Sequence, residues 1–151
     1  MSAGTIYERV GGDDAFLRIA RAFHERALAD PVLNHPFSHP GHPQHVERLA
    51  AYWAEALGGP ATYSGEMSDQ TGMLRIHANN GMGHDFQERF LACFMAALDD
   101  ASISSDATLR DALRAYMSWA LRDVVQYSAK DAVVPDALSL PHWSWDGLVV
   151  S

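Results

Sequence analysis

The chain has 151 residues, 48% of them hydrophobic and 20% charged, which is typical of a globular protein with one domain and a single sizeable core. Eleven basic and nineteen acidic residues give a net charge of −8 and a sequence pI near 5.3. This balance repels nucleic-acid phosphates and anionic lipid, so we expect neither nucleic acid nor membrane as a partner.

Three features indicate a cytoplasmic location. The longest nearly apolar run, residues 90–98, is shorter than a bilayer crossing requires. The first residues lack the basic start and apolar stretch of a secretory signal. Cys93, the only cysteine, has no partner for an intrachain disulfide and is expected to be a small core residue in a reducing compartment.

Two amphipathic helices are predicted before residue 60. Apolar residues recur at three-and-four spacing before Pro31, and again before a Gly-Gly-Pro sequence at residues 58–60 that is typical of a helix end. Asp13 or Asp14 is the expected N-cap of the first helix. The stripes consist of Phe16, Ile19, Ala20, Phe23 and Ala27 in the first helix and of Val46, Leu49, Ala50, Trp53 and Leu57 in the second.

A histidine-rich segment, HPFSHPGHPQH at residues 35–45, connects these helices. It holds four of the chain's eight histidines, with three prolines and a glycine. Imidazole is a common metal ligand, so a metal cage is one interpretation; a polar loop stiffened by proline is the other. A proline follows three of the four histidines, which disfavours their convergence on a tetrahedral zinc ion.

Two more amphipathic helices are predicted in the second half, the last of them beginning near Ser105 or Asp106. The intervening segment, residues 61–85, is rich in Gly, Asn and Ser, and so long a loop usually serves a function. No alternating strand and no internal repeat is recognised. The two stripes consist of Phe86, Phe90, Cys93, Phe94 and Ala97, and of Leu109, Leu113, Tyr116, Met117, Ala120 and Val124.

After residue 128 the chain continues into a tail that ends in PHWSWDGLVVS. Its two tryptophans are too apolar for a free tail, so we expect it to pack back on the body of the domain. A surface for a protein partner is the alternative.

Four short motifs occur together in this chain. They are YERVGG at residues 7–12, DPVLNHPF at 30–37, ERLAAYWAEALGGPATYSG at 47–65 and MLRIHA at 73–78. Each is weak alone, but two Gly-Gly pairs with a histidine about eighteen residues beyond the second pair form a specific combination. Over residues 6–128 the chain resembles the truncated haemoglobins, and most closely group II of that family.

The resemblance implies an all-α truncated globin fold, a two-over-two helical sandwich with a short N-terminal helix and a C-terminal extension. Residues 1–151 then form a single globin-like domain with its core at about 6–128 and the extension at 129–151. Residues 16–29 correspond to helix B of the family and 46–57 to helix E. The implied cofactor is haem b with its iron, bound without covalent attachment because the chain has no Cys-x-x-Cys-His motif.

The resemblance also implies how the haem is held. His77 matches the proximal ligand of the iron, with a hydrogen-bonded core histidine as the alternative. Phe37 matches an aromatic residue that packs on the haem, a role compatible with core packing. Tyr63 and Arg75 are propionate candidates; Tyr63 also suits the surface, and Arg75 is weaker because the family's arginine position is Ile76 here. The apolar cavity is expected to be lined by Leu49, Trp53, Leu74, Phe86, Phe90 and Trp119.

Two histidines are implied on the distal side. His45 matches the distal position of helix E, opposite His77, with an outward, gate-like orientation as the alternative. His24 replaces the group's B-helix tyrosine, and a partly exposed helix surface is its alternative position. Phe90 replaces the near-invariant helix-G tryptophan, which removes an indole N–H donor. The remaining histidines of the segment, expected to be solvated loop residues, are His35, His39 and His42.

The leading hypothesis is a cytoplasmic haem protein that binds O2, NO or CO at an iron held by His77, for oxygen binding or transport. His45 and His24, the expected catalytic residues, suit a peroxidase-like or NO-dioxygenase side activity, which requires an electron donor that the sequence does not identify. One alternative is a bis-histidyl haem protein for electron transfer or redox sensing. Another is a haem-free helical module that binds a metal or a protein. A monomer and a homodimer are both compatible with the sequence.

Overall fold

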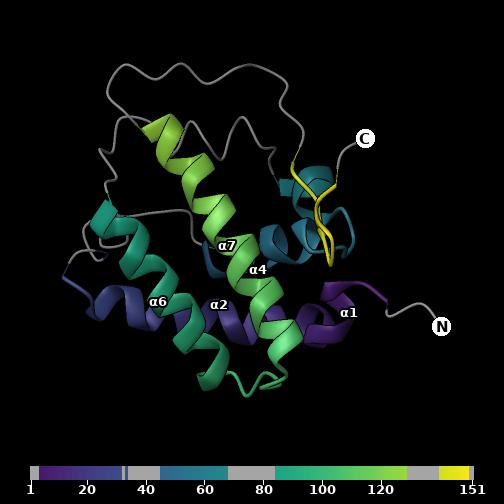
Figure 1. Ribbon diagram of the computed structural model, residues 1–151, viewed down its shortest axis with the longest axis horizontal. Helices are drawn as coiled ribbons and strands as arrows, with labels where there is room; N and C mark the ends of the chain where they lie inside the picture. Colours follow the sequence, from purple (N-terminus) through teal and green to yellow (C-terminus); the bar gives the residue numbers. More distant parts are fainter. Residues whose placement is uncertain (1–3, 32, 34–44, 68–83, 129–139, 150–151) are drawn as a thin grey trace.

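The computed structural model describes residues 4–31, 33, 45–67, 84–128 and 140–149. Four long helices correspond to the four predicted amphipathic segments, and a short helix precedes them (Figure 1). The elements in chain order are α1 (Ile6–Val10), α2 (Gly12–Ala29), α4 (His45–Ala56), the π-helical turn η1 (Tyr63–Met67), α6 (His84–Asp100), α7 (Ala107–Ser128), β1 (Trp143–Ser144) and β2 (Gly147–Leu148).

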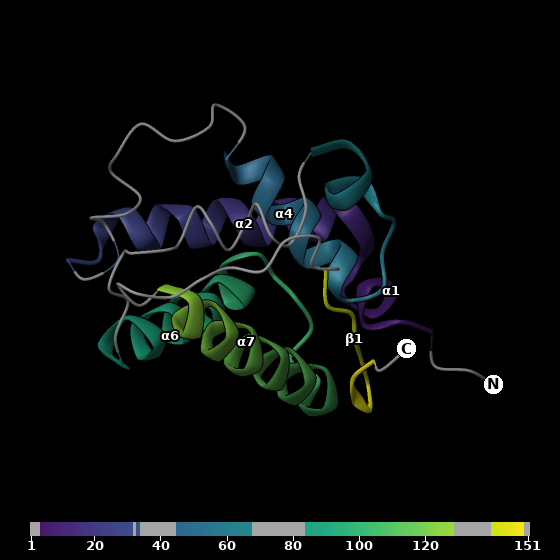
Figure 2. The same ribbon diagram turned by 90° about the horizontal axis from the view of Figure 1, so that it is seen from above.

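The long helices form two layers. The helices α2 and α4 pack together in one layer, and α6 and α7 pack together in the other. The layers cross where α2 lies on α6, and Figure 2 shows α6 and α7 beneath α2 and α4. This is the two-over-two arrangement that the resemblance implies.

The core lies between these layers and is built from the predicted apolar stripes. Every residue of the α2 stripe is buried, whereas the stripes of α4 and α6 include half-buried residues such as Val46 and Phe90. The largest fully buried side chains are Tyr116, Phe16, Phe23, Phe94, Ile6, Ile19, Leu33, Leu57, Leu98, Leu109 and Leu113.

Two Gly-Gly pairs fix α1 against the end of α4. Gly11 and Gly12 have φ angles of 126° and 81°, a region that favours glycine, and the chain turns there directly from α1 into α2. A Cβ on Gly59 would lie 2.5 Å from the ring of Tyr7, so the approach of α1 requires glycine. The backbone N–H of Tyr7 also donates to the carbonyl oxygen of Leu57 at 2.9 Å.

The expected N-cap of α2 is wrong, whereas that of α7 is confirmed. Because α1 runs straight into α2, the cap position falls on Gly11, which makes no side-chain cap. Asp13 and Asp14 lie in the first turn instead, where carboxylates interact favourably with the helix dipole. In α7, the Asp106 carboxylate accepts the backbone N–H of Leu109 at 3.2 Å, which is the geometry of a cap.

The described part of the tail packs on the domain, as expected, but contains a hairpin that the sequence analysis did not predict. Strands β1 and β2 pair antiparallel with Trp143 opposite Leu148, and Gly147 has a φ of 107°. The Trp145 indole Nε1–H donates to the Gly4 carbonyl at 2.9 Å. The end of the tail is therefore tied to the beginning of the chain.

Among the described residues, the exposed large apolar side chains are Leu28, Leu148 and Val149. None of the helices in the described ranges has the length and apolar character that crossing a membrane requires. Cys93, expected in the core, is half-buried instead, because it lies at the edge of the α6 stripe. Burial raises the pKa of its thiol, which keeps it in the less reactive neutral form.

Candidate functional site

Five aromatic residues meet where α2, α4 and α6 cross: Phe23, Trp53, Phe86, Phe90 and Phe94. We call this cluster the aromatic junction. The ring of Phe23 lies 4.5 Å from that of Phe90 and 5.5 Å from that of Trp53. Trp53 also lies edge-on to Phe94 at 5.1 Å, and Phe86 lies 5.9 Å from Phe90. Three expected cavity residues, Trp53, Phe86 and Phe90, are thus brought together.

Phe90, the expected replacement for the family's helix-G tryptophan, packs as an apolar ring in the aromatic junction. Its half-buried ring is tilted against both Phe23 and Phe86. A phenyl ring in this packing contributes apolar contact but has no hydrogen-bond donor. Phe90 therefore adds no hydrogen-bond donor to the aromatic junction.

His24 lies on α2 directly after Phe23, the central ring of the aromatic junction. The residue is half-buried, and its Nδ1 atom is buried from solvent. The nitrogen atoms of an imidazole can donate or accept hydrogen bonds.

The π-helical turn η1 is held against α4 at both ends. Near its start, the Glu55 carboxylate accepts the backbone N–H of Ser64 at 2.9 Å and its hydroxyl at 2.5 Å. At its end, Arg48 donates to the carbonyl oxygen of Met67 at 3.2 Å. Glu55 is only 2% exposed, and it could not be predicted from the sequence because a buried glutamate in a helix has no distinguishing pattern.

We call these hydrogen bonds between α4 and η1 the clamp on η1. They position Tyr63, the first residue of η1. Its side chain is 5% exposed, and its ring lies edge-on to that of Tyr52 at 5.1 Å. Tyr63 is therefore buried, and the alternative of a surface tyrosine is wrong. The contact with Ser64, the next residue, shows how Glu55 fixes this part of the backbone.

Trp119 lies apart from the aromatic junction in the described contacts. Its ring, on α7, lies 5.8 Å from that of Trp143 in the C-terminal hairpin. Trp143 also lies 6.2 Å from the ring of Tyr116, a 1% exposed residue whose hydroxyl has no hydrogen-bond partner among the described residues. Burial raises the pKa of Tyr116, so its hydroxyl stays protonated and can donate. Leu49, on α4, is half-buried.

Several expected site residues lie outside the described part of the chain. His45 begins α4, but its side chain is not described. Among the described residues, no group of three or more histidine, cysteine or acidic side chains is arranged to hold a metal ion. The expected residues outside the described ranges are His35, Phe37, His39, His42, Leu74, Arg75 and His77.

The aromatic junction has the apolar, aromatic character that a haem site requires. Cofactor sites are lined mostly by hydrophobic and aromatic side chains with a few polar atoms among them. The aromatic junction supplies such a lining, and the buried Nδ1 atom of His24 lies next to it in sequence. The expected axial ligand, His77, is outside the described residues.

Comparison with known proteins gives the following similarities. Residues 5–126 match the family model described as bacterial-like globin. A thermostable haemoglobin of known structure from the actinobacterium Thermobifida fusca is 32% identical, with a TM-score of 0.68 over 81% of this chain and 97% of that chain. A curated group 1 truncated haemoglobin from Tetrahymena pyriformis is 23% identical over 127 residues, 84% of this chain and 93% of that protein.

A group II truncated haemoglobin from Bacillus anthracis has a TM-score of 0.72 at 18% identity, covering 87% of this chain and 98% of that one. At this identity the likeness concerns the fold. It confirms the expected all-α, two-over-two truncated globin architecture. The match to the family model ends at residue 126, before the C-terminal hairpin.

Proposed function

Because the chain belongs to the bacterial-like globins, we propose that it is a cytoplasmic haem protein that binds O2, NO or CO at an iron held by His77. Globins bind diatomic gases at haem iron, and the family therefore implies this cofactor. The aromatic junction is the observation that carries the proposal, because it supplies an apolar wall where α2, α4 and α6 meet. Without a covalent attachment motif, the haem is of the b type.

Haem, when bound, would supply an iron that binds a diatomic gas, and His77 is the residue that would hold it. The chain's residues then have separate tasks. Trp53, Phe86 and Phe90 exclude water, which strengthens electrostatic contacts inside the pocket. Tyr63, fixed in place by the clamp on η1, is a proposed hydrogen-bond donor to a propionate. Further proposed contacts with the haem come from Phe37, Leu49, Leu74, Arg75 and Trp119.

His24 and His45 are the proposed distal residues. Phe90 has no donor, so hydrogen bonding to a bound ligand falls to these two imidazoles. An N–H bond stabilises a ligand that carries partial negative charge, as O2 does, more than it stabilises CO. Histidine exchanges protons near neutral pH, which also suits a peroxidase-like or NO-dioxygenase side activity with an external electron donor.

The proximal role is tested by His77→Gly. The purified wild type is expected to show a Soret band and to release its haem into acid butanone. The variant is expected to bind haem weakly, with added imidazole restoring part of the absorbance, because a free imidazole can occupy the space left by the side chain. His142→Ala, a histidine of the C-terminal tail, is the matched control. An unchanged haem content in His77→Gly would contradict the proposal.

The distal roles are tested by O2 dissociation rates. Loss of a hydrogen bond worth about 1.5 kcal/mol speeds dissociation roughly tenfold, which is the expected effect of His45→Leu and of His24→Phe. The double variant is expected to be less than additive if both imidazoles bond the same ligand. A low-spin ferric wild type that only one substitution converts to high spin would indicate direct ligation by that histidine instead. Unchanged rates and spectra in all three variants would refute both assignments.

A further inference from the structure

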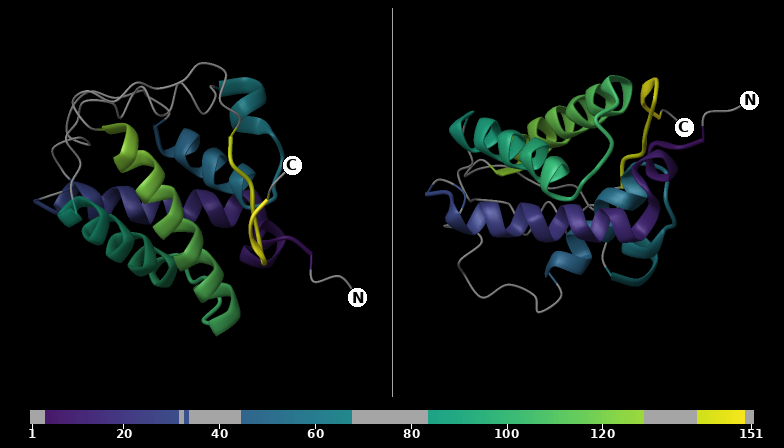
Figure 3. Two further views of the ribbon diagram at one scale, coloured as in Figure 1. Left: turned by 45° about the horizontal axis from the view of Figure 1, so that its top comes forward. Right: turned by 90° about the horizontal axis from the view of Figure 1, so that it is seen from below.

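The C-terminal hairpin lies outside the residues that the globin family model matches. It comprises β1, β2 and the two residues between them, and the family match ends at residue 126. The hairpin, yellow in Figure 3, lies beside α1. It is anchored by the hydrogen bond from Trp145 to Gly4 and, just before β1, by Leu140, which is buried. An anchored segment can influence a site that it contacts.

The contact with the rest of the domain is made by Trp143. Its ring lies 5.8 Å from Trp119 and 6.2 Å from Tyr116. Tyr116 and Trp119 are three residues apart on α7, so they lie on the same face of that helix. Trp143 therefore packs across two successive turns of one face of α7.

We propose that Trp143 is a positioning residue of the haem site, acting through Trp119. This inference rests on the proposed function, because Trp119 is a proposed haem contact. A half-buried indole without a neighbour has several accessible rotamers, and packing by a second ring restricts them. By covering this face of α7, Trp143 fixes the Trp119 ring and keeps water from the buried Tyr116 hydroxyl.

Thermodynamic linkage gives this proposal a second consequence. If the packed hairpin strengthens haem binding, haem binding must stabilise the packed hairpin by the same factor. A hairpin that only stabilises the fold would be protected by haem through global unfolding alone, and its local opening would be unchanged. The two roles are therefore separable in solution.

The first test is the rate of haem transfer to an excess of apomyoglobin. Trp143→Ala is expected to lose haem about threefold to tenfold faster than wild type, the factor that corresponds to one aromatic pair. Trp143→Phe keeps a ring and is expected to recover most of the difference. Val149→Ala, an exposed position next to the hairpin that is not the strand partner of Trp143, is the control and is expected to match wild type.

The second measurement uses only the wild type, and so does not depend on the folding of a variant. Backbone amides of residues 140–149 are expected to exchange through local opening more slowly with haem bound than without it. Equal local exchange in both forms, or equal haem loss from Trp143→Ala and wild type, would overturn the role of Trp143. A wild type without a Soret band after haem supplementation would instead overturn the proposed function itself.

Discussion

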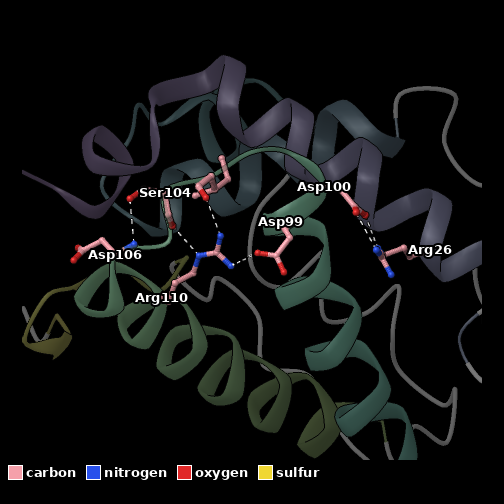
Figure 4. Close-up of polar contacts among 7 residues, drawn as sticks. Arg26, Asp99, Asp100, Ser104, Asp106 and Arg110 are labelled. Carbon is pink, nitrogen blue, oxygen red and sulfur yellow. Dashed lines mark hydrogen bonds and ion pairs between the residues drawn. The ribbon is translucent and has the colours of Figure 1, made fainter.

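At the aromatic junction, α2, α4 and α6 meet through packed rings, whereas the turn between α6 and α7 is held by arginine side chains. Figure 4 shows Arg110 between the ends of those helices. Its guanidinium donates to the carbonyl oxygens of Ser104 and Ile103, both at 2.8 Å, and to the Asp99 carboxylate at 2.9 Å. Ser102, in the same turn, has a φ of 59°, a left-handed conformation uncommon for a residue other than glycine.

We call residues 101–106, between α6 and α7, the arginine-braced turn. Two arginines of α2 connect this region to the other layer of helices. Arg18 donates to the carbonyl oxygen of Ala101 at 3.3 Å, and Arg26 makes two hydrogen bonds with Asp100, at 2.5 and 2.9 Å. The aromatic junction and the arginine-braced turn differ in the interactions that stabilise them. Burial of rings is expected to supply most of the free energy, while the arginine contacts fix the path of a solvated turn.

The largest expected effect is that of Trp53→Ala at the aromatic junction. Trp53 is 3% exposed and contacts rings on α2 and α6, so truncation removes buried apolar contacts and leaves a cavity. We expect a loss of about 3–5 kcal/mol in the free energy of unfolding, measured by urea denaturation of the haem-free protein. Leu148→Ala, at an exposed site, is the control. A loss below about 1 kcal/mol would mean that the junction is not a packed core.

An intermediate effect is expected from Arg110→Ala in the arginine-braced turn. The substitution removes donors to two backbone carbonyls, but water can reach the turn and satisfy them in part. We expect a loss of about 1–2 kcal/mol in the same denaturation experiment. Arg110→Lys keeps the charge without the planar fork and is expected to recover only part of it. A loss as large as that of Trp53→Ala would remove the contrast between the two regions.

The sequence predicts the aromatic junction better than the arginine-braced turn, and the reason is physical. Phe23, Trp53 and Phe94 belong to apolar stripes, and burial makes helical periodicity visible in one sequence. The contact of Arg18 with Ala101 joins residues 83 positions apart through a backbone carbonyl. Such a contact depends on tertiary structure and leaves no local pattern.

Two local features, the N-cap of α2 and the C-terminal hairpin, were also not predicted correctly from the sequence. The expected Asp13 or Asp14 cap failed because α1 leads directly into α2. The hairpin had a usable signal in the Asp146-Gly147 pair, typical of tight turns, but its strands are too short for alternation to be seen. For the site, periodicity cannot separate a cavity wall from ordinary core, so the roles of its residues rest on the family motifs.

The smallest expected effect is that of Asp100→Asn, which removes the ion pair with Arg26. The side chains of Arg26 and Asp100 are 45% and 40% exposed, so solvent and salt screen their attraction. We expect a small decrease in Tm at pH 7. It should be smaller than the decrease in Tm caused by Arg110→Ala, and smaller still at high salt. Asp111→Asn, on the exposed surface of α7, is the matched control.

The pH dependence gives this last prediction its sign. The hydrogen bond from Arg26 lowers the pKa of the Asp100 carboxyl from its ordinary value of 3.8. A carboxyl with a lowered folded-state pKa stabilises the protein above the ordinary value, and this contribution is lost as the pH falls through the folded-state pKa. The difference in Tm between wild type and Asp100→Asn should therefore be constant from pH 7 to about pH 5 and shrink towards pH 3. A difference that grows on acidification would show that Asp100 acts through contacts other than its charge.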